Sequence, residues 1–288
     1  SPGSNARYRE KVLAHGLGQP VPAQQPKGDA RRLFADWVVS PENQWFAKNA
    51  SNRIWAQLFG HGLVEPIDDF RDTNPASHPE LLEKLADFLV RNNYDVKSLV
   101  KLIIASEAYQ RSSNPVKGNE TDELNYSRFL LKPLPAEVLF DAISMATGVP
   151  AVFEGYPAGT RAIQLWDSRY QDYFLKVHGR PLRLSSCSCE RQKEPGVAQV
   201  LHEFNSPELH RKLSHEQGRI ARLVAANSSQ KEIIEDLFLS YFSRFPGKDE
   251  MDLAIELISK AKNTNGRREA LEDLAWSMMN SLEFLFNH

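Results

Sequence analysis

Residues 40–60, SPENQWFAKNASNRIWAQLFG, carry the pattern that decides the fold class. Ser40 followed by Pro41 is typical of a helix N-cap with proline at the first helical position. Apolar residues then recur at helical spacing up to Gly60, a residue type that commonly ends helices. The stretch therefore predicts an amphipathic helix that begins at Pro41 and ends at Gly60.

Similar helix signals recur along the rest of the chain. Ser77 with Glu80 fits a capping box, and Ser229 with Glu232 fits another. Apolar residues at helical spacing follow both boxes and several proline or serine starts. On these signals we expect helices at about 77–89, 96–103, 135–148, 206–223, 229–241 and 271–285. The sequence therefore predicts an all-α, multi-helix globular domain.

Glycine and proline divide the chain into three parts. Residues 1–30 contain closely spaced prolines, which predicts a linker with little core of its own. Residues 149–195 are too rich in glycine and proline for long elements, so we expect a loop-rich insert, with a short strand at 162–166. We predict a single helical domain over 31–288, with a subdivision near the insert as an alternative.

Composition and missing motifs exclude several classes of protein. The 288 residues are 41% hydrophobic, enough to bury a core. The 35 basic residues balance the 37 acidic ones, which disfavours nucleic-acid binding, and no run is apolar enough for a membrane span. Nucleotide loops, a nucleophile elbow, a zinc-protease helix and a Cys-x-x-Cys-His haem motif are all missing. We expect no cofactor in this segment.

The first candidate site combines Asp68, Asp69, Arg71 and His78. Paired carboxylates beside a guanidinium and an imidazole can perform acid–base catalysis, because like charges split their pKa values. The alternative is structural, with the aspartates and Arg71 tying a loop between two helices through bidentate hydrogen bonds.

The second candidate site is a ligand loop whose candidate residues are Arg161, Trp166, Glu190 and Arg191. Asp167, Tyr170 and Tyr173 lie close to Trp166 in the sequence. Aromatic and polar residues on a loop can line a ligand cleft or form a sugar platform. Alternatively, the aromatic rings form a small satellite core that holds the insert in place.

The third candidate site is the run Cys187-Ser-Cys189-Glu190-Arg191. The two thiols can close a small strained disulfide with a redox role, and nearby arginines would favour the thiolate. They can also ligate a soft metal, with Glu190 or a histidine completing the shell, although we expect no metal. A third possibility is a pair of ordinary thiols.

Many blocks in order resemble the planctomycete cytochrome-associated PSD-type domain of unknown function. The likeness runs from Arg31 to the last residue. The matching blocks are RRLFADW (31–37), SPEN (40–43), NRIW (52–55), LFGHGLV (58–64), DDFR (68–71), SHPELL (77–82), YQ (109–110), CSCER (187–191) and NSLEFLFNH (280–288). One departure is Gly247, which stands where the family commonly has a threonine that caps the next helix.

The resemblance implies a setting that composition does not. Such domains typically end large exported proteins of Planctomycetes and Verrucomicrobia, behind a PSCyt-type companion domain and often a domain with c-type haem. It implies that residues 1–30 link to that companion and that the chain is periplasmic or at the cell surface. An oxidising compartment would favour the Cys187–Cys189 disulfide. The resemblance supplies no catalytic residues.

These observations lead to two expectations about function. The first is a non-catalytic docking or redox-accessory module, whose partners are the companion domain of the same polypeptide and a redox partner. The second is an enzyme or binding module that acts on a sulfated or otherwise decorated polysaccharide, since the genes of such proteins often lie near sulfatases and other polysaccharide-degrading enzymes.

Overall fold

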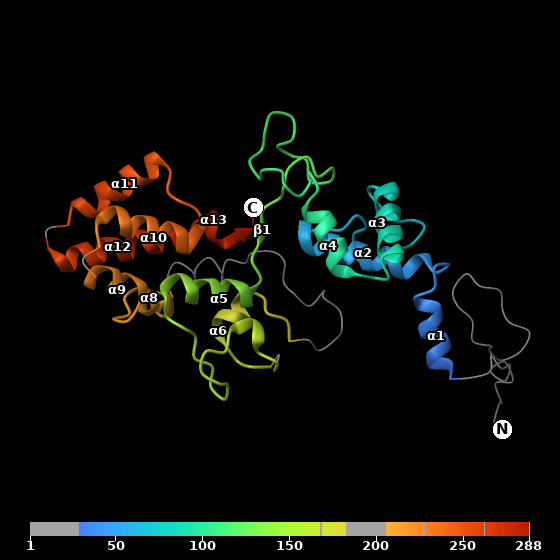
Figure 1. Ribbon diagram of the computed structural model, residues 1–288, viewed down its shortest axis with the longest axis horizontal. Helices are drawn as coiled ribbons and strands as arrows, with labels where there is room; N and C mark the ends of the chain where they lie inside the picture. Colours follow the sequence, from blue (N-terminus) through green and yellow to red (C-terminus); the bar gives the residue numbers. More distant parts are fainter. Residues whose placement is uncertain (1–28, 168, 183–205, 227, 262, 288) are drawn as a thin grey trace, which may run out of the picture. The chain divides into compact units, whose positions relative to one another are not determined.

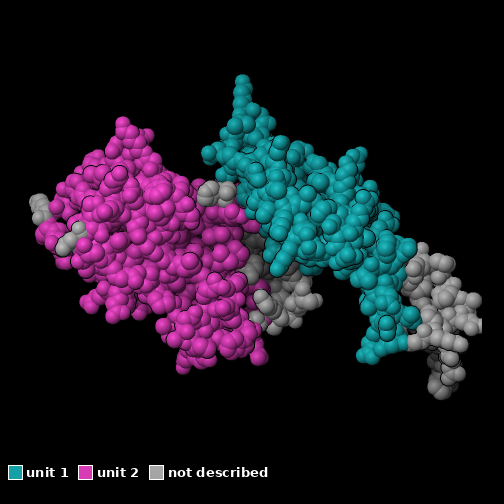
Figure 2. Space-filling model, viewed as in Figure 1, with its two compact units in different colours: residues 1–130 teal, residues 131–288 magenta. Residues whose placement is uncertain are grey.

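A computed structural model describes residues 29–167, 169–182, 206–226, 228–261 and 263–287 (Figure 1). Helices dominate these residues, and their strands are only two residues long. The predicted all-α fold is therefore confirmed. The chain divides into two compact units, residues 1–130 and 131–288 (Figure 2). The loop-rich region at 149–195 thus lies wholly in the second unit, and folding of 31–288 as a single domain stays a prediction.

The first unit begins with two helices, α1 (Ala30–Val38) and α2 (Gln44–Phe59). The start predicted for α2 at Pro41 is wrong, because Asn43 is the N-cap. Its Oδ1 accepts hydrogen bonds from the backbone N–H groups of the residues two and three positions on, at 3.0 and 3.3 Å. The predicted end is correct, since Gly60 adopts the left-handed conformation, with φ of 91°.

The helices expected at 77–89 and 96–103 are α3 (Pro79–Arg91) and α4 (Val96–Ile104). The capping box predicted at Ser77 is wrong. His78 occupies the N-cap without a side-chain cap, and the Ser77 hydroxyl donates instead to the carbonyl of Leu63, at 3.2 Å. At α4 the carboxylate of Asp95 caps the first turn.

Aromatic rings dominate the core of the first unit. Trp55 and Phe59 stack in α2 with centroids 4.2 Å apart. Tyr126 and Phe129, from the irregular segment that follows α4, pack against them at 5.1 and 6.1 Å. Leucines of α3 and α4 complete this core. Residues far apart in the sequence therefore hold the α2–α3 region in place.

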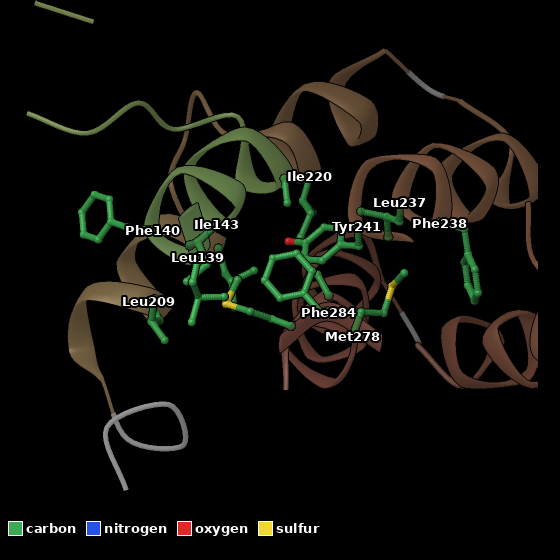
Figure 3. Packing of buried hydrophobic residues seen from close by; sticks show 14 of the residues in the cluster. Leu139, Phe140, Ile143, Leu209, Ile220, Leu237, Phe238, Tyr241, Met278 and Phe284 are labelled. Atoms are coloured by element: carbon green, nitrogen blue, oxygen red, sulfur yellow. The ribbon is translucent and has the colours of Figure 1, made fainter. Parts of the chain in front are cut away.

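The second unit is held together by helices from both ends of its sequence. A strand pair joins β1 (Lys132–Pro133) to β2 (Phe286–Asn287) in antiparallel register. Next comes α5 (Ala136–Thr147), which ends at the predicted Gly148. Figure 3 shows its side chains within the core. Among the labelled core residues are Leu139 and Ile143 of α5, Leu209, Ile220, Leu237, Tyr241, Met278 and Phe284.

The described part of the loop-rich insert contains two short helices, η2 (Ala162–Gln164) and α6 (Tyr173–Val177). The strand predicted at 162–166 is therefore wrong. The carboxylate of Asp141 in α5 accepts hydrogen bonds from the N–H groups of Ala162 and Ile163, at 2.7 and 3.3 Å. These bonds favour a helical turn, because they satisfy N–H groups that have no partner within it.

The single helix predicted from Ser206 to Leu223 is divided into α8 (Pro207–Leu213) and α9 (Arg219–Ala225). Ser206 caps the first of these as predicted. The capping box at Ser229 is also confirmed, and it opens α10 (Gln230–Phe242). Reciprocal hydrogen bonds of 2.8 and 3.2 Å join Ser229 and Glu232.

Three further helices follow, α11 (Lys248–Ser259), α12 (Thr264–Met279) and α13 (Leu282–Leu285). The predicted last helix is interrupted at Ser281, which is the N-cap of α13. Arg244 connects this region, because its guanidinium forms bidentate hydrogen bonds with both Glu250 and Glu283, at 2.6–2.8 Å. Hydrogen bonds from Arg244 lower the pKa of Glu250 to about 2.

Candidate functional site

The first candidate site lies in the loop of residues 60–78, between α2 and α3. Asn52 of α2 is completely buried beneath it. The Asn52 amide donates to the carbonyls of Val64 and Ile67, at 2.9 and 2.8 Å, and its Oδ1 accepts from the N–H of Val64, at 3.0 Å. Because a buried amide is costly without partners, these bonds define where the loop lies on the helix.

Gly62 lets this loop approach the helix closely. A Cβ atom at this position would lie 2.5 Å from the carbonyl oxygen of Val64 and 2.9 Å from the amide of Asn52. Both distances are well inside van der Waals contact. The Gly60-His-Gly62 motif therefore serves backbone packing here, with Gly60 ending α2 and Gly62 leaving room for the Asn52 bonds.

Asp68 binds the helix beside this contact. The Arg53 guanidinium donates to both carboxylate oxygens of Asp68, at 2.7 and 2.6 Å, and the amide of Asn49 donates at 2.9 Å. The Arg53 hydrogen bonds hold the pKa of Asp68 below its usual value. Asn49 and Arg53 lie one helical turn apart, so a single face of α2 supplies both donors.

Asp69 forms a different ion pair. Its carboxylate accepts two hydrogen bonds from Arg71, both at 2.6 Å. Arg71 is exposed, and burial of the Asp69 side chain is only partial. The amide of Asn74 donates to the backbone carbonyls of Glu65 and Asp69, at 3.1 and 2.9 Å, which closes the loop on itself. Asp68 and Asp69 are therefore neighbours in sequence with separate partners.

His78 belongs to a third set of contacts, around Tyr126. His78 Nδ1 lies 3.1 Å from the hydroxyl of Ser77, and its ring centroid is 5.7 Å from that of Tyr126. The imidazole of His61 stacks on Tyr126 at 4.6 Å, with 5° between the planes. Tyr126 itself donates to the carbonyl of Gly62, at 3.1 Å, and burial raises its pKa to about 12.

In the described residues, the four catalytic candidates thus lie in three sets of contacts. Both oxygens of each aspartate accept hydrogen bonds from an arginine, which makes them poor general bases. His61 and Tyr126 were not predicted as site residues. His61 lies within a glycine motif that marks the loop, but no local signal marks Tyr126, which reaches the site only through tertiary packing.

The ligand loop lies in the second unit. Phe153, Leu165 and Phe174 are buried in the main core of that unit, and Tyr156 and Tyr170 pack against it. The exposed aromatic residues are Trp166, at 73%, and Tyr173, at 66%. Arg161 is also exposed, and its backbone N–H donates to Oε1 of Gln164, at 3.0 Å. Most aromatic side chains of the loop therefore pack in the core or against it, whereas Trp166 and Tyr173 lie at the surface.

Basic side chains gather at the carboxyl end of α5. Lys212 is only 8% exposed, and its Nζ donates to Ser144 Oγ and to the carbonyl of Val149, at 3.3 and 3.1 Å. Burial lowers the pKa of Lys212. Arg219 donates to the carbonyl of Ala146, at 2.7 Å, and forms an ion pair with Asp236. These contacts satisfy polar groups in the last turn of α5 and just after it, so we assign them a structural role.

The third candidate site cannot be placed, because Cys187, Cys189, Glu190 and Arg191 lie outside the described residues. Within the described ranges, no group of three or more His, Cys, Asp and Glu side chains is arranged to hold a metal ion. The helices described here also include none that is long and apolar enough to cross a membrane.

The fold and these contacts define an all-α chain of two helical units whose polar loop is tied to its own helices. The model of the PSD1 family, described as a protein of unknown function (DUF1553), matches residues 30–258. That range is most of the chain and includes parts of both units, so the chain belongs to the PSD1 family. No curated protein and no solved structure matches it.

Proposed function

We propose that this chain is a non-catalytic docking module of a larger exported protein that bears a cytochrome domain. The observation that carries the proposal is helix α1. Its nine residues are too few for a stable isolated helix in water. Leu33 is 39% exposed and Phe34 is 63% exposed, with Trp37 one turn further along the same face. Such a face requires a partner, and the companion domain of the same polypeptide is the one that we propose.

The polar loop supports the same proposal. Acid–base catalysis by the candidate residues would need carboxylates or imidazoles whose lone pairs can reach a substrate. The aspartates of the loop are each paired with an arginine, and Asn52 and Asn74 hold backbone groups of the loop. These bonds stabilise the chain itself, which is what a docking scaffold requires.

The test uses the parent protein. Replacing Leu33 and Phe34 together by aspartate should lower the thermal midpoint of the companion domain, because charge is placed in the docking face. Leu253→Asp, at a residue 69% exposed on α11, is the matched control and should leave the midpoint unchanged. If the double substitution, or deletion of residues 30–288, leaves the stability of the companion unchanged, the docking proposal is wrong.

We also propose a redox role for this chain, which rests on Cys187 and Cys189. A disulfide between them, formed in an oxidising compartment, would couple the thiol–disulfide state of this chain to the haem domain. The experiment is a redox titration of the parent protein with and without the Cys187→Ser and Cys189→Ser substitutions. A haem potential that is the same in both proteins would contradict the relay but would leave docking intact.

A further inference from the structure

Trp166 has an unusual position in the second unit. Its neighbour Leu165 is 7% exposed and belongs to the core, yet the indole itself is 73% exposed. Exposing so large an apolar ring is unfavourable, because burial of an aromatic side chain removes a large apolar area from water. A loop can ordinarily move to bury such a ring. The contacts that keep Trp166 at the surface therefore indicate that its exposure has a role.

The backbone on both sides of Trp166 is fixed by a buried ion pair. Arg180 donates to the carbonyls of Leu165 and Asp167, at 3.3 and 3.1 Å. Its guanidinium also pairs with Glu137 of α5, at 3.8 Å, with the two side chains only 7% and 6% exposed. A charged pair this deeply buried is costly to rearrange, so residues 165–167 have little freedom to turn Trp166 inward.

The ring of Trp166 is supported from one side by tyrosines. Tyr156 packs against the indole with centroids 4.2 Å apart, and its hydroxyl accepts from the N–H of Asp167, at 3.3 Å. Tyr170 supports Tyr156 edge-on, at 5.5 Å, and its hydroxyl accepts from the N–H of Glu154, at 2.9 Å. The indole is therefore held by its neighbours while most of its surface faces solvent.

Planar polar side chains accompany the indole in this loop. Arg161 and Gln164 are exposed on one side of Trp166 in the sequence. On the other side, Arg169 lies 3.7 Å from Asp167, and their side chains are 78% and 47% exposed. Asp167 Oδ1 also accepts a hydrogen bond from the backbone N–H of Arg169, at 2.9 Å. An exposed pair at this distance is weak, so the Arg169 guanidinium and the other carboxylate oxygen of Asp167 are available to a ligand.

We propose that Trp166, with Asp167 and Arg169 beside it, forms a binding platform for the pyranose ring of a polysaccharide. The C–H groups on one face of a pyranose carry partial positive charge and stack on the negative face of an indole. The hydroxyls of the sugar would then accept hydrogen bonds from Arg169 and donate to Asp167. This proposal rests on residues of the second unit and does not depend on the docking proposal for α1.

A saccharide fits this platform better than a protein does. A stable protein interface buries about 800 Å² on each partner around an apolar centre. Near Trp166 in the sequence, Gln164, Asp167 and Arg169 are polar and exposed. Ile163, at 52%, and Tyr173, at 66%, are also exposed in this segment. The indole, held beside exposed Asp167 and Arg169, suits a ligand that is itself polar at its edges and apolar on one face.

The test is affinity electrophoresis of the purified chain in gels that contain β-glucan, xylan, galactomannan or chondroitin sulfate. We expect at least one polysaccharide to retard the chain, and Trp166→Ala to weaken that binding at least tenfold. Trp166→Phe should retain part of it, and Arg169→Ala should weaken it severalfold. Trp45→Ala, in the first unit at 36% exposure, is the matched control and should bind like the wild type.

Circular dichroism should give the same thermal midpoint for Trp166→Ala as for the wild type, because the ring is mostly exposed. The proposal is overturned if none of the four polysaccharides retards the wild type. It is also overturned if Trp166→Ala is retarded as strongly as the wild type. Loss of companion-domain binding in Trp166→Ala, without any polysaccharide binding by the wild type, would assign Trp166 to a protein interface instead.

Discussion

Arg53 and Asp68 are joined by two parallel hydrogen bonds of 2.7 and 2.6 Å, so the α2–α3 loop is fastened to the face of α2. The Asp68 carboxylate also accepts from Asn49. Asp69 forms its ion pair with a different arginine, Arg71. Two adjacent carboxylates that resemble a catalytic pair in the sequence are therefore separate structural contacts.

The lowered pKa of Asp68 predicts how acid affects the ion pair between Arg53 and Asp68. A carboxyl whose pKa is lowered in the folded state stabilises that state above its unfolded pKa, near 4, and this contribution disappears as the pH falls through the folded pKa. Asp68→Asn should therefore be less stable than the wild type at pH 7 and should lose less stability below about pH 4. Urea unfolding between pH 2 and pH 7 measures the difference.

Asp87→Asn is the control for this experiment. Asp87 forms an exposed ion pair with Arg91, at 3.9 Å, which should contribute little. Parallel loss of stability on acidification by the wild type and by Asp68→Asn would contradict the role assigned to Asp68.

Asn52 should be far more important for stability than its neighbour Asn49. Asn52→Ala removes three hydrogen bonds and leaves backbone groups of Val64 and Ile67 unsatisfied, which should cost about 3 kcal/mol of unfolding free energy. Asn49→Ala removes one hydrogen bond and should cost about 1 kcal/mol. Chemical denaturation of both variants checks the order. Equal losses would show that the loop does not depend on the buried amide.

Gly62 is expected to tolerate no side chain. Gly62→Ala would place a methyl group 2.5 Å from the Val64 carbonyl, so the loop would have to move and the Asn52 bonds would lengthen. We expect a loss of about 3 kcal/mol, comparable to other strained substitutions. Gly247→Ala, where the nearest atom is a flexible Glu250 oxygen at 3.3 Å, should cost much less in a thermal unfolding assay. A stable Gly62→Ala variant would contradict the packing described for the loop.

Arg244 should stabilise the second unit through geometry as well as charge. Arg244→Lys keeps the charge but cannot form bidentate bonds with Glu250 and Glu283 together. Because these side chains are 27–41% exposed, solvent screening limits the expected loss to about 1 kcal/mol. Arg91→Lys, in an exposed pair, should change the urea midpoint very little. An Arg244→Lys variant with wild-type stability would show that the fork geometry is unimportant.

Helix ends show where the sequence was sufficient and where it was not. The box at Ser229 and the stop at Gly60 were predicted correctly, because each depends on atoms within a few residues. The starts predicted at Pro41 and Ser77 were wrong. Asn43 offers a competing cap close by, and the Ser77 hydroxyl instead bonds a carbonyl in the loop that precedes it.

The candidate site was likewise predicted only in part from the sequence. The sequence indicated the loop that carries Asp68, Asp69, Arg71 and His78. It did not indicate that His78 would lie beside Tyr126, or that His61 would stack on the same ring. Those contacts depend on where the segment after α4 packs.

The sequence by itself determined the all-α class and the positions of most helices, because hydrophobic periodicity and caps act locally. It also determined the membership of the PSD1 family, through the match of the family model to residues 30–258. Only the tertiary structure decided that the polar loop is tied by buried Asn52, and that Trp166 is held at the surface by Arg180 and Glu137. Such contacts join residues that are distant in the chain. Their energies depend on burial, which no local pattern reports.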